Sequence, residues 1–303
     1  MTEPALTIGL GEVLWDLLPS GKVLGGAPAN FAYMTNVLGD QGIVASRVGD
    51  DDLGHEARQI MQELGLNTTY LQQDSQHETG CATVMIDAAG QPNFIIKELV
   101  AWDFLQWTAE WQELSARADV VCFGSLAQRS PTSAATIERF LQNTPKKTLR
   151  ICDANLRQSF YNRDVLQRSL RHAHILKLNE HELPRVSLLL GFESGDEESL
   201  ARRLLKEYGL RLVCITRGAS GSLLVSHDQT VEHKGFCVKV ADAVGAGDAF
   251  TACLAHHYIR GSSLEEINES ANRLASWVAT QTGATPAIRA EQLQKIFGGA
   301  AYG

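Results

Sequence analysis

Apolar and polar positions along the chain follow two alternating patterns. Short apolar runs are separated by longer stretches in which apolar residues recur with the period of an α-helix, and a glycine follows several of these stretches. Such alternation predicts βα units with a mostly parallel sheet covered by helices on both faces. The predicted strands span residues 6–16, 43–48, 120–123, 149–153, 175–178, 212–216 and 237–240. The predicted helices span residues 28–38, 54–64, 132–142, 163–171, 198–208, 249–260 and 264–281.

One region departs from this βα alternation. Residues 79–87 and 93–97 read as two strands, and a turn at Ala88-Ala89-Gly90 joins them. The pattern predicts a β-hairpin. A hairpin inserted into a βα series exposes a face of its own, which suits a lid or a dimerisation sheet. An edge extension of the main sheet is the alternative.

Composition places the chain among ordinary globular proteins. Its 303 residues suit two domains or one large α/β domain, and the 44% hydrophobic and 20% charged fractions exclude disordered or fibrous classes. Lys and Arg number 27 against 35 Asp and Glu, a net charge of −8 without a basic block, which argues against nucleic acid and membrane surfaces as partners. No apolar run approaches the ~20 residues of a membrane span, and Met1–Pro4 is not a basic signal region, so a cytoplasmic location is expected.

The six cysteines form no C-x-x-C pair. Most stand inside apolar runs, which is typical of small buried hydrophobic residues in a reducing compartment rather than of disulfides or metal ligands. They are Cys81, Cys122, Cys152, Cys214, Cys237 and Cys253.

Several further patterns are discounted as sites. Gly9-Leu10-Gly11 lacks the third glycine of a dinucleotide-binding loop, and the chain holds no G-x-x-x-x-G-K-[ST] phosphate loop. The histidine pairs at 172/174 and 256/257 lack metal-ligand spacing and are interpreted as surface or helix-packing residues. The run Asp50-Asp51-Asp52 is interpreted as a helix-entry cap, with a contribution to a substrate site as the alternative.

The strongest chemical signal is the segment ADAVGAGDAF at residues 241–250, which opens a predicted helix. Gly245 and Gly247 permit a tight turn and leave backbone N–H groups uncovered at a helix N-terminus, where the helix dipole favours an anion. Asp248 stands in the same turn. A carboxylate there can accept the proton of a hydroxyl that attacks a phosphoryl group, while the amides of residues 245–247 hold the developing charge. An ordinary capped turn is the alternative.

A second glycine-rich segment, GGAPAN at residues 25–30, precedes another predicted helix. Pro28 suits the first helical turn, and the two glycines let a ligand approach the backbone. Asn30 offers donors and an acceptor for polyol hydroxyls, and Asp16 could accept hydrogen bonds from the same hydroxyls. A plain glycine-rich helix entry is the alternative.

Polar residues also follow three predicted strands in the middle of the chain. Arg157 follows one strand, Asn179 and Glu182 the next, and Thr216–Gly221 a third. In α/β sheets such positions face the crevice that binds ligands. Arg157 suits phosphate oxygens, Asn179 and Glu182 suit water around Mg²⁺, and the third turn suits a nucleotide phosphate. Ordinary polar loops are the alternative in each case.

Taken together, these segments resemble the ribokinase-like (phosphofructokinase-B type) sugar kinase family, and within it the bacterial fructokinases. The resemblance rests on Gly25-Gly26 with Asn30, on residues 242–248 and on the matching middle, and it covers nearly the whole chain in order. It implies one kinase domain over residues 1–303, a doubly wound, mostly parallel α/β sheet flanked by helices, with a small β-sheet lid formed by about residues 12–24 and 79–98. It also implies ATP and Mg²⁺ as cofactors and, in many members, a monovalent cation such as K⁺.

Carried over by position, the resemblance implies a role for each matching residue. The catalytic residues are Asp248 as the base, Gly245, Ala246 and Gly247 as the anion hole, and Arg157 as the phosphate-facing arginine. The sugar contacts are Asp16, Gly25, Gly26, Asn30, Phe94 and Asp248. The nucleotide contacts are Asn179, Thr216, Gly218, Gly221, Gly245, Gly247 and Asn272. The metal residues are Glu182 and Asn179 for Mg²⁺ through water, and Asp242 and the Val244 carbonyl, with residues 278–287, for the monovalent cation.

Two departures from the family pattern bear on these expectations. Ala243 stands where the family usually has threonine, which removes a hydroxyl near the cation loop and would weaken monovalent activation. The loop 17–24 is short, and the lid ends in Lys97-Glu98 and then Trp102-Asp103-Phe104. Because lid and loop line the sugar pocket in this family, both features bear on which sugar is bound.

The expected activity is ATP-dependent phosphorylation of a primary hydroxyl on a small sugar, with fructose as the first candidate. The alternatives are another sugar or sugar acid, such as ribose or 2-keto-3-deoxygluconate, a nucleoside, and a sugar- or nucleotide-binding regulator without turnover. The exposed face of a lid sheet would suit a homodimer.

Overall fold

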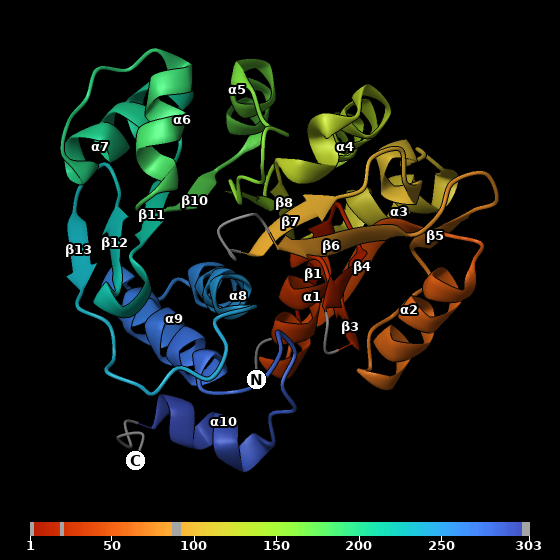
Figure 1. Cartoon of the computed structure of the whole chain (residues 1–303). Coiled ribbons are helices and arrows are strands. Elements are labelled where there is room, and N and C mark those ends of the chain that lie inside the picture. Colours follow the sequence, from red (N-terminus) through yellow and green to blue (C-terminus); the bar gives the residue numbers. More distant parts are fainter. Residues whose placement is uncertain (1–2, 19–20, 87–91, 299–303) are drawn as a thin grey trace.

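Two separate β-sheets organise the chain (Figure 1), whose computed structural model describes residues 3–18, 21–86 and 92–298. The larger sheet contains β1 (Leu6–Leu10), β4 (Gln41–Gly49), β5 (Leu71–Asp74), β8 (Val120–Gly124), β9 (Leu149–Asp153), β10 (Ile175–Asn179), β11 (Leu212–Thr216), β12 (Ser222–Val225) and β13 (Thr230–His233). Its order is β13-β12-β11-β10-β9-β8-β1-β4-β5, and only the β11–β12 and β12–β13 pairings are antiparallel. The smaller sheet contains β2 (Leu14–Leu18), β3 (Gly21–Gly25), β6 (Gly80–Ile86) and β7 (Pro92–Ile96) in the order β3-β2-β6-β7.

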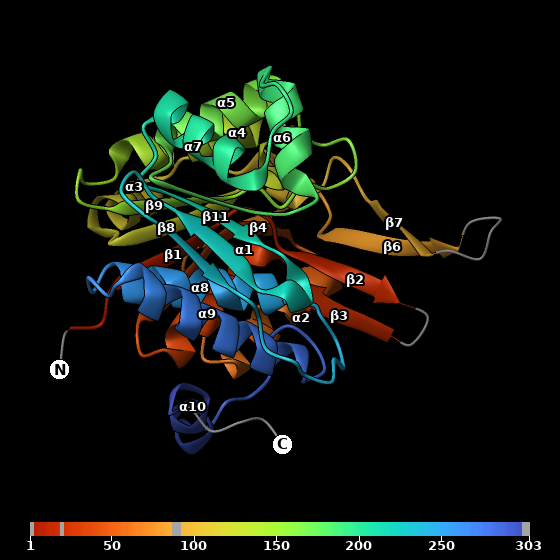
Figure 2. The ribbon, with the colours of Figure 1, turned by 90° about the vertical axis from the view of Figure 1, so that its left-hand side faces the viewer.

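Helices cover both faces of the larger sheet (Figure 2). One face carries α3 (Ala109–Arg117), α4 (Pro131–Asn143), α5 (Arg163–His172), α6 (Glu182–Leu190) and α7 (Glu197–Tyr208). The other carries α1 (Ala27–Val37), α2 (Asp52–Glu63), α8 (Ala246–Tyr258) and α9 (Leu264–Ala279), and α10 (Ala290–Phe297) packs against α9. The predicted doubly wound, mostly parallel sheet is therefore confirmed.

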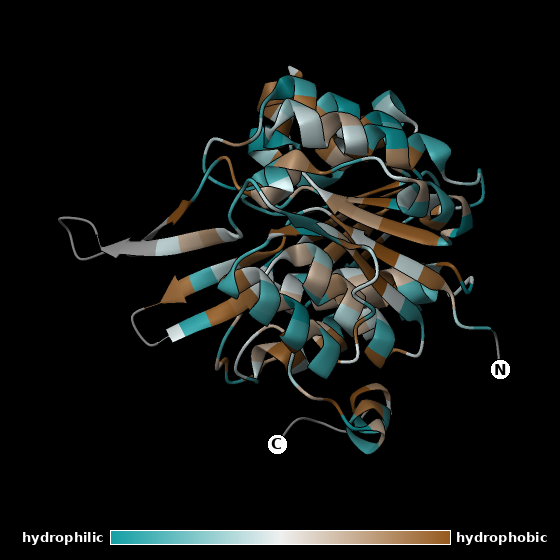
Figure 3. Ribbon diagram, turned by 90° about the vertical axis from the view of Figure 1, so that its right-hand side faces the viewer, coloured by the Kyte–Doolittle hydropathy of each residue, from teal (hydrophilic) through white to brown (hydrophobic). Residues whose placement is uncertain are grey.

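The core consists of two apolar layers, one on each face of the larger sheet. Along β8, Val121 and Phe123 pack into the layer under α3–α7, whereas Val120 and Cys122 pack into the layer under α1, α8 and α9. This alternation follows from the two-residue repeat of a strand. Because both faces are covered, the central strands are mostly apolar (Figure 3), with few charged residues such as Lys177 in their interior.

Two predicted strands differ in the structure. The predicted strand 6–16 is interrupted, because the chain leaves the larger sheet after Leu10 and enters the smaller one at Leu14. Gly11, with φ +149°, lies at this crossing. The strand predicted over 237–240 does not form; that segment is irregular and exposes Val240. Helices α3, α6 and α10 and strands β5, β12 and β13 are additions that the apolar pattern does not predict.

The smaller sheet contains the predicted hairpin. Strands β6 and β7 are antiparallel, β6 pairs in parallel with β2, and the turn predicted at residues 88–90 lies outside the described residues. This sheet projects from the body of the molecule (Figure 2) and is not an edge of the larger sheet. Val23 on β3 and Ile95 on β7 are exposed, and the expected homodimer stays a prediction.

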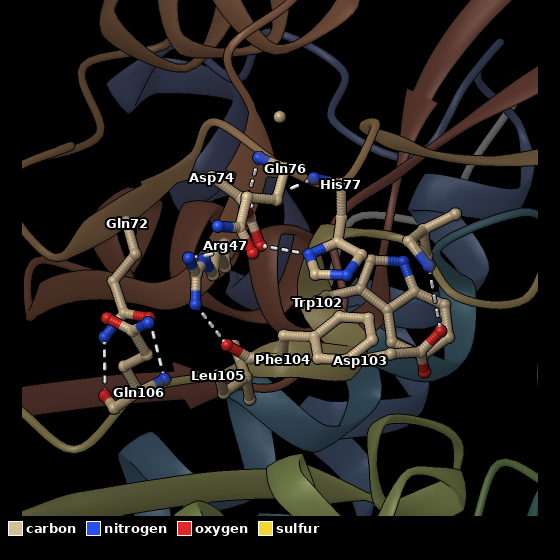
Figure 4. A network of polar contacts seen from close by, with 12 residues as sticks. Arg47, Gln72, Asp74, Gln76, His77, Trp102, Asp103, Phe104, Leu105 and Gln106 are labelled. Carbon is tan, nitrogen blue, oxygen red and sulfur yellow. Dashed lines mark hydrogen bonds and ion pairs between the residues drawn. The ribbon is translucent and has the colours of Figure 1, made fainter.

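Buried charges anchor the base of the smaller sheet (Figure 4). Asp74 at the end of β5 pairs with Arg47 of β4 at 3.1 Å and with His77 Nδ1 at 2.9 Å. His77 stacks on Phe104 with 3.6 Å between ring centroids, and Arg47 donates to the Phe104 carbonyl. These contacts fasten both chain segments that enter β6 and leave β7 to the larger sheet.

The minor sequence interpretations can also be compared with the structure. Asp51 caps α2 by accepting the Gly54 N–H at 2.8 Å, as predicted. His256 of α8 pairs at 2.6 Å with Asp40 in the turn after α1, in agreement with a packing role. Four cysteines are buried, but Cys237 is exposed and Cys81 half-buried, which corrects the expectation of burial for these two. Within the described segments, no helix is both long and apolar enough for a membrane span.

Candidate active site

The two glycine-rich segments meet at the carboxyl edge of the larger sheet. Helix α1 begins after Gly26 and packs against α8, which begins after Gly245. Asn30 Nδ2 donates to Asp248 Oδ2 at 2.8 Å, although 218 positions separate the two residues. Strands β9, β10 and β11 end at the same edge, so their polar loops face the two helix starts.

The start of α8 has the features of an anion cradle. Gly245 has φ +79°, and a Cβ there would lie 2.6 Å from Cα of Ala284, so only glycine fits. Among the described residues no side chain caps the first turn. The Ala246 N–H donates to the Ala243 carbonyl at 3.3 Å. The N–H groups of Gly247 and Asp248 receive no side-chain cap within the described part of the chain, and the helix dipole there favours an anion.

Asp248 lies in this first turn and is half-buried. The pKa of Asp248 is raised to about 6, mainly by burial. The negative charge of Asp153 also raises this pKa, and its effect is larger than the opposite effect of the hydrogen bond from Asn30. Asp248 is therefore a stronger base than an ordinary carboxylate and remains largely ionised at neutral pH. These properties suit the acceptance of a proton from a hydroxyl group.

A buried ion pair lies beneath the cradle and was not predicted from the sequence. Lys177 Nζ contacts both oxygens of Asp153 at 3.0 and 3.2 Å, and Thr251 of α8 donates to Asp153 Oδ2 at 3.1 Å. Burial lowers the pKa of Lys177, but the charges of Asp153, Glu182 and Asp248 outweigh it and raise that pKa. A Cβ on Gly247 would lie 3.1 Å from Nζ, which places the ammonium beside the cradle. The only signal in the sequence is a lysine inside an apolar strand.

Glu12 is a second acid that sequence reasoning missed. It stands at the crossing between the two sheets, its side chain is buried, and Oε2 has no hydrogen-bond partner among the described residues. Burial raises the pKa of Glu12 to about 7, and the charges of Asp248 and Asp153 contribute, whereas Arg157 acts in the opposite direction. Its backbone oxygen would lie 2.6 Å from a Cβ on Gly26, so Glu12 sits directly against the start of α1.

Arg157 is exposed at the end of β9, and its Nη1 donates to the Leu156 carbonyl at 3.2 Å. The residues on either side of this pair, Asn155 and Gln158, have φ of +39° and +48°. Non-glycine residues adopt such values at a cost and most often where function requires the shape. The guanidinium is thus presented to solvent at the edge where the cradle lies.

The side-chain oxygens of Asn179 and Glu182 bond to backbone groups. Asn179 Oδ1 accepts the N–H groups of His181 and Glu182, both at 2.9 Å. Glu182 Oε1 and Oε2 accept the N–H groups of Leu156 and Asn179, at 2.7 and 2.9 Å. No group of three or more Asp, Glu, His or Cys side chains in the described part of the chain could hold a metal ion. Their role toward Mg²⁺ stays a prediction.

The predicted sugar contacts come from the smaller sheet and the two helix starts. Asp16 lies on β2, where burial raises its pKa against the opposing charge of Arg157. A Cβ on Gly25 would lie 2.8 Å from Asp16 Oδ2, so this glycine makes room for the carboxylate. Phe94 lies on β7, but its side chain is outside the described part of the structure.

The predicted nucleotide contacts differ in accessibility. Thr216 is half-buried and Gly218 exposed after β11. Gly221 is buried, and a Cβ there would lie 2.0 Å from the His233 carbonyl oxygen, which gives this glycine a packing role. Asn272 is also buried and donates to Ser222 Oγ at 2.7 Å. The nucleotide roles of these residues stay predictions.

Asp242 joins two loops at the predicted monovalent cation site. Its Oδ1 accepts the Val244 N–H at 3.0 Å, and its Oδ2 accepts the Gly283 N–H at 3.1 Å. The structure thus brings the loop before α8 next to the predicted segment 278–287. Binding of the cation itself stays a prediction.

A doubly wound sheet, a smaller sheet beside its strand ends and a carboxyl at an uncapped helix start define the ribokinase-like class of carbohydrate kinases. The model of the pfkB family carbohydrate kinases matches residues 20–291. The fructokinase of Escherichia coli is 31% identical over 307 residues, which cover 93% of this chain and 96% of that protein. Fructokinase-2 of rice (Oryza sativa subsp. japonica) is 27% identical, with 94% and 91% covered.

Solved structures give the same result. A sugar kinase of Pyrococcus horikoshii has a TM-score of 0.82 at 26% identity, with 96% of this chain and 97% of that one covered. A fructokinase of Xylella fastidiosa with bound ATP shares the fold, with a TM-score of 0.84 at 21% identity and 96% and 98% covered. The chain belongs to the pfkB family of carbohydrate kinases, which are phosphotransferases with an alcohol group as acceptor.

Proposed function

We propose that this carbohydrate kinase transfers a phosphoryl group from ATP to a primary hydroxyl of fructose. The observation that carries the proposal is Asp248, which lies beside the uncapped start of α8 and is oriented by Asn30 at 2.8 Å. A base and an anion cradle in one helical turn suit an attack by a hydroxyl on a phosphoryl group.

In this proposal the sugar lies between the smaller sheet and the strand ends, in contact with Asp16, Gly26 and Asn30. Asp248 accepts the proton of the primary hydroxyl as its oxygen bonds to the γ-phosphorus and the bond to ADP breaks. Its pKa of about 6 leaves it ionised at neutral pH. The backbone N–H groups of residues 245–247 and the Arg157 guanidinium stabilise the charge on the transferred group.

Nucleotide and cations take up positions at the same edge. The phosphates of ATP would extend from Thr216 and Gly218 toward the start of α8. Mg²⁺, when bound, neutralises phosphate charge; it keeps several waters in proteins, so contacts with Asn179 and Glu182 would be made through water. Closure of the smaller sheet as a lid over the sugar would exclude water as a competing acceptor.

Fructose is favoured by the names of the relatives, since the E. coli and rice proteins are fructokinases. The segment that ends the lid is the feature most able to change that specificity. There Lys97 pairs with Glu78 on the surface, and Asp103 pairs with Arg129 at 2.8 Å.

The test is ADP release with Mg·ATP against fructose, ribose, 2-keto-3-deoxygluconate, adenosine and no acceptor, each with and without K⁺. We expect the highest kcat/KM with fructose and a weak response to K⁺ because Ala243 lacks a hydroxyl. A preference for another acceptor would overturn the fructose assignment but keep the kinase. Sugar binding by calorimetry without ADP release for any acceptor would contradict the kinase assignment for this chain.

A further inference from the structure

The loop that carries Arg157 needs external support. Asn155 and Gln158 hold left-handed backbone conformations, which non-glycine residues keep only where surrounding contacts enforce them. Arg157 itself is exposed and supplies no buried anchor. On one side the loop is fixed at Ala154, whose N–H donates to the Lys177 carbonyl at 2.9 Å and whose carbonyl accepts from Ser125 Oγ at 2.7 Å.

Glu182 provides the support on the other side. Its carboxylate is buried, with Oε1 on the Leu156 N–H at 2.7 Å and Oε2 on the Asn179 N–H at 2.9 Å. Asn179 in turn accepts the Glu182 N–H at 2.9 Å, which fixes the first residue of α6. A single carboxylate therefore ties the loop after β9 to the end of β10. Hydrogen bonds to an ionised acceptor are among the stronger ones in proteins.

We propose that Glu182 is a positioning residue for Arg157. Its carboxylate holds Leu156 so that the neighbouring guanidinium stands at the phosphate cradle, a role that is separate from the contact with Mg²⁺ through water proposed above. The inference rests on the proposed function in one respect, which is the role given to Arg157. Loss of the carboxylate would leave the Leu156 N–H, which is buried, without its acceptor.

The experiment compares Glu182→Gln, which keeps one acceptor oxygen, with Glu182→Ala, which keeps none. Glu180→Gln is the matched control, because this carboxylate lies in the same turn but points to the surface near His181. Each substitution is made alone and with Arg157→Ala. The measurements are kcat, KM for ATP and sugar, the Mg²⁺ dependence of the rate, and hydrogen exchange of the amides of residues 154–158.

We expect Glu182→Gln to lower kcat roughly tenfold and Glu182→Ala to lower it further. A displaced Arg157 guanidinium stabilises the transferred phosphoryl group less well, which lowers the rate rather than the affinity for the sugar. With Arg157 already removed, the same substitutions should cost less than about twofold, because the two residues act as a unit. Exchange at Leu156 should rise by about tenfold or more, in the order Gln then Ala. Glu180→Gln should change none of these quantities.

Two results would overturn the inference. One is an equal loss of kcat in both the Arg157 and the Arg157→Ala backgrounds. The other is unchanged exchange at Leu156 in Glu182→Ala; a shifted Mg²⁺ dependence beside it would identify Glu182 with the cation. Exchange is independent of turnover: unchanged exchange in Glu182→Ala refutes the tie even in an active enzyme. Faster exchange supports it even if no acceptor is phosphorylated and the proposed function fails.

Discussion

Buried acids in this chain fall into two groups with opposite surroundings. Asp40 is the clearest member of the first group. It accepts the Ala5 N–H at 3.1 Å and pairs with His256 and Arg260, both at 2.6 Å. Burial raises the pKa of Asp40, but these partners outweigh burial and the pKa is lowered. Asp74 behaves in the same way at the base of the smaller sheet.

Asp248 and Glu12 form the second group. Asp248 has the hydrogen bond from Asn30, and Glu12 has an oxygen without a partner among the described residues. Burial dominates in both, and their pKa values rise to about 6 and about 7. Cations pair directly with Asp40 and Asp74, whereas among the described residues none pairs directly with Asp248 or Glu12. An incompletely satisfied acid in a cleft is therefore the mark of the site.

The two cations near the second group, Lys177 and Arg157, do not pair directly with Asp248 or Glu12 in the described part of the chain. Lys177 gives its charge to Asp153, and Arg157 stands exposed on its loop. Pairing either cation directly with Asp248 would lower the pKa of the base and occupy the space that the transferred phosphoryl group needs. The difference between the groups is thus a consequence of where the positive side chains are held.

The largest expected effect that follows from this comparison is on turnover. Asp248→Asn should lower kcat by at least about 10²-fold, because the amide cannot accept the proton of the attacking hydroxyl. Its fold should persist, since no cation is left unpaired. The measurement is ADP release at saturating sugar and Mg·ATP, together with a thermal melt.

Asp74→Asn is the matched control from the supported group. It should melt at a lower temperature, because the buried Arg47 loses its carboxylate, yet it should keep its kcat. Turnover above a tenth of wild type in Asp248→Asn would show that Asp248 is not the base.

The second effect concerns pH. Since the protonated form of Asp248 cannot accept a proton, kcat/KM should fall about tenfold per pH unit below pH ~6. Asn30→Ala removes a hydrogen bond that lowers the pKa of Asp248, so the acid limb should move to higher pH in that variant. The measurement is kcat/KM between pH 5 and pH 8. A limb that stays in place in Asn30→Ala but disappears in Glu12→Gln would assign it to Glu12 instead.

The comparison also explains what the sequence can and cannot predict. The βα alternation predicts the larger sheet, and the glycine segments predict where α1 and α8 begin, because glycine and helix-start signals are local. The contact of Asn30 with Asp248 is seen only in the structure. The crossing after Leu10 is not evident from the sequence, because Gly11 and Glu12 are followed at once by the apolar residues 13–15. Glu12 and Lys177 are charged residues among apolar neighbours in the sequence, and those neighbours do not indicate a role for them. Their roles depend on which side chains the fold brings close to them.

Gly221 and Asn272 have packing roles that the sequence pattern does not reveal, while their nucleotide roles stay predictions. Their residue types suit a nucleotide site, but Gly221 makes room for the His233 backbone and Asn272 bonds to Ser222. A sequence pattern cannot separate such packing roles from contacts with a ligand, because both favour small or polar residues near strand ends.

The smallest effect is a pair of stability differences with opposite dependence on pH. Asp40 has a lowered pKa in the folded chain, so its contribution is present above the unfolded carboxyl value and is lost as the pH falls through the folded one. The free energy of unfolding of Asp40→Asn should therefore be about 2 kcal/mol lower than that of wild type at pH 8, and the difference should shrink progressively in strong acid.

Glu12 has a raised pKa, so its ionisation opposes folding as the pH rises from 4.5 to about 7. Glu12→Gln should therefore gain about 1–2 kcal/mol at pH 8 and nothing near pH 4. Urea unfolding of both variants and wild type from pH ~2 to pH 8 measures these differences. A Glu12→Gln variant that is destabilised at pH 8 would place Glu12 in the supported group with Asp40.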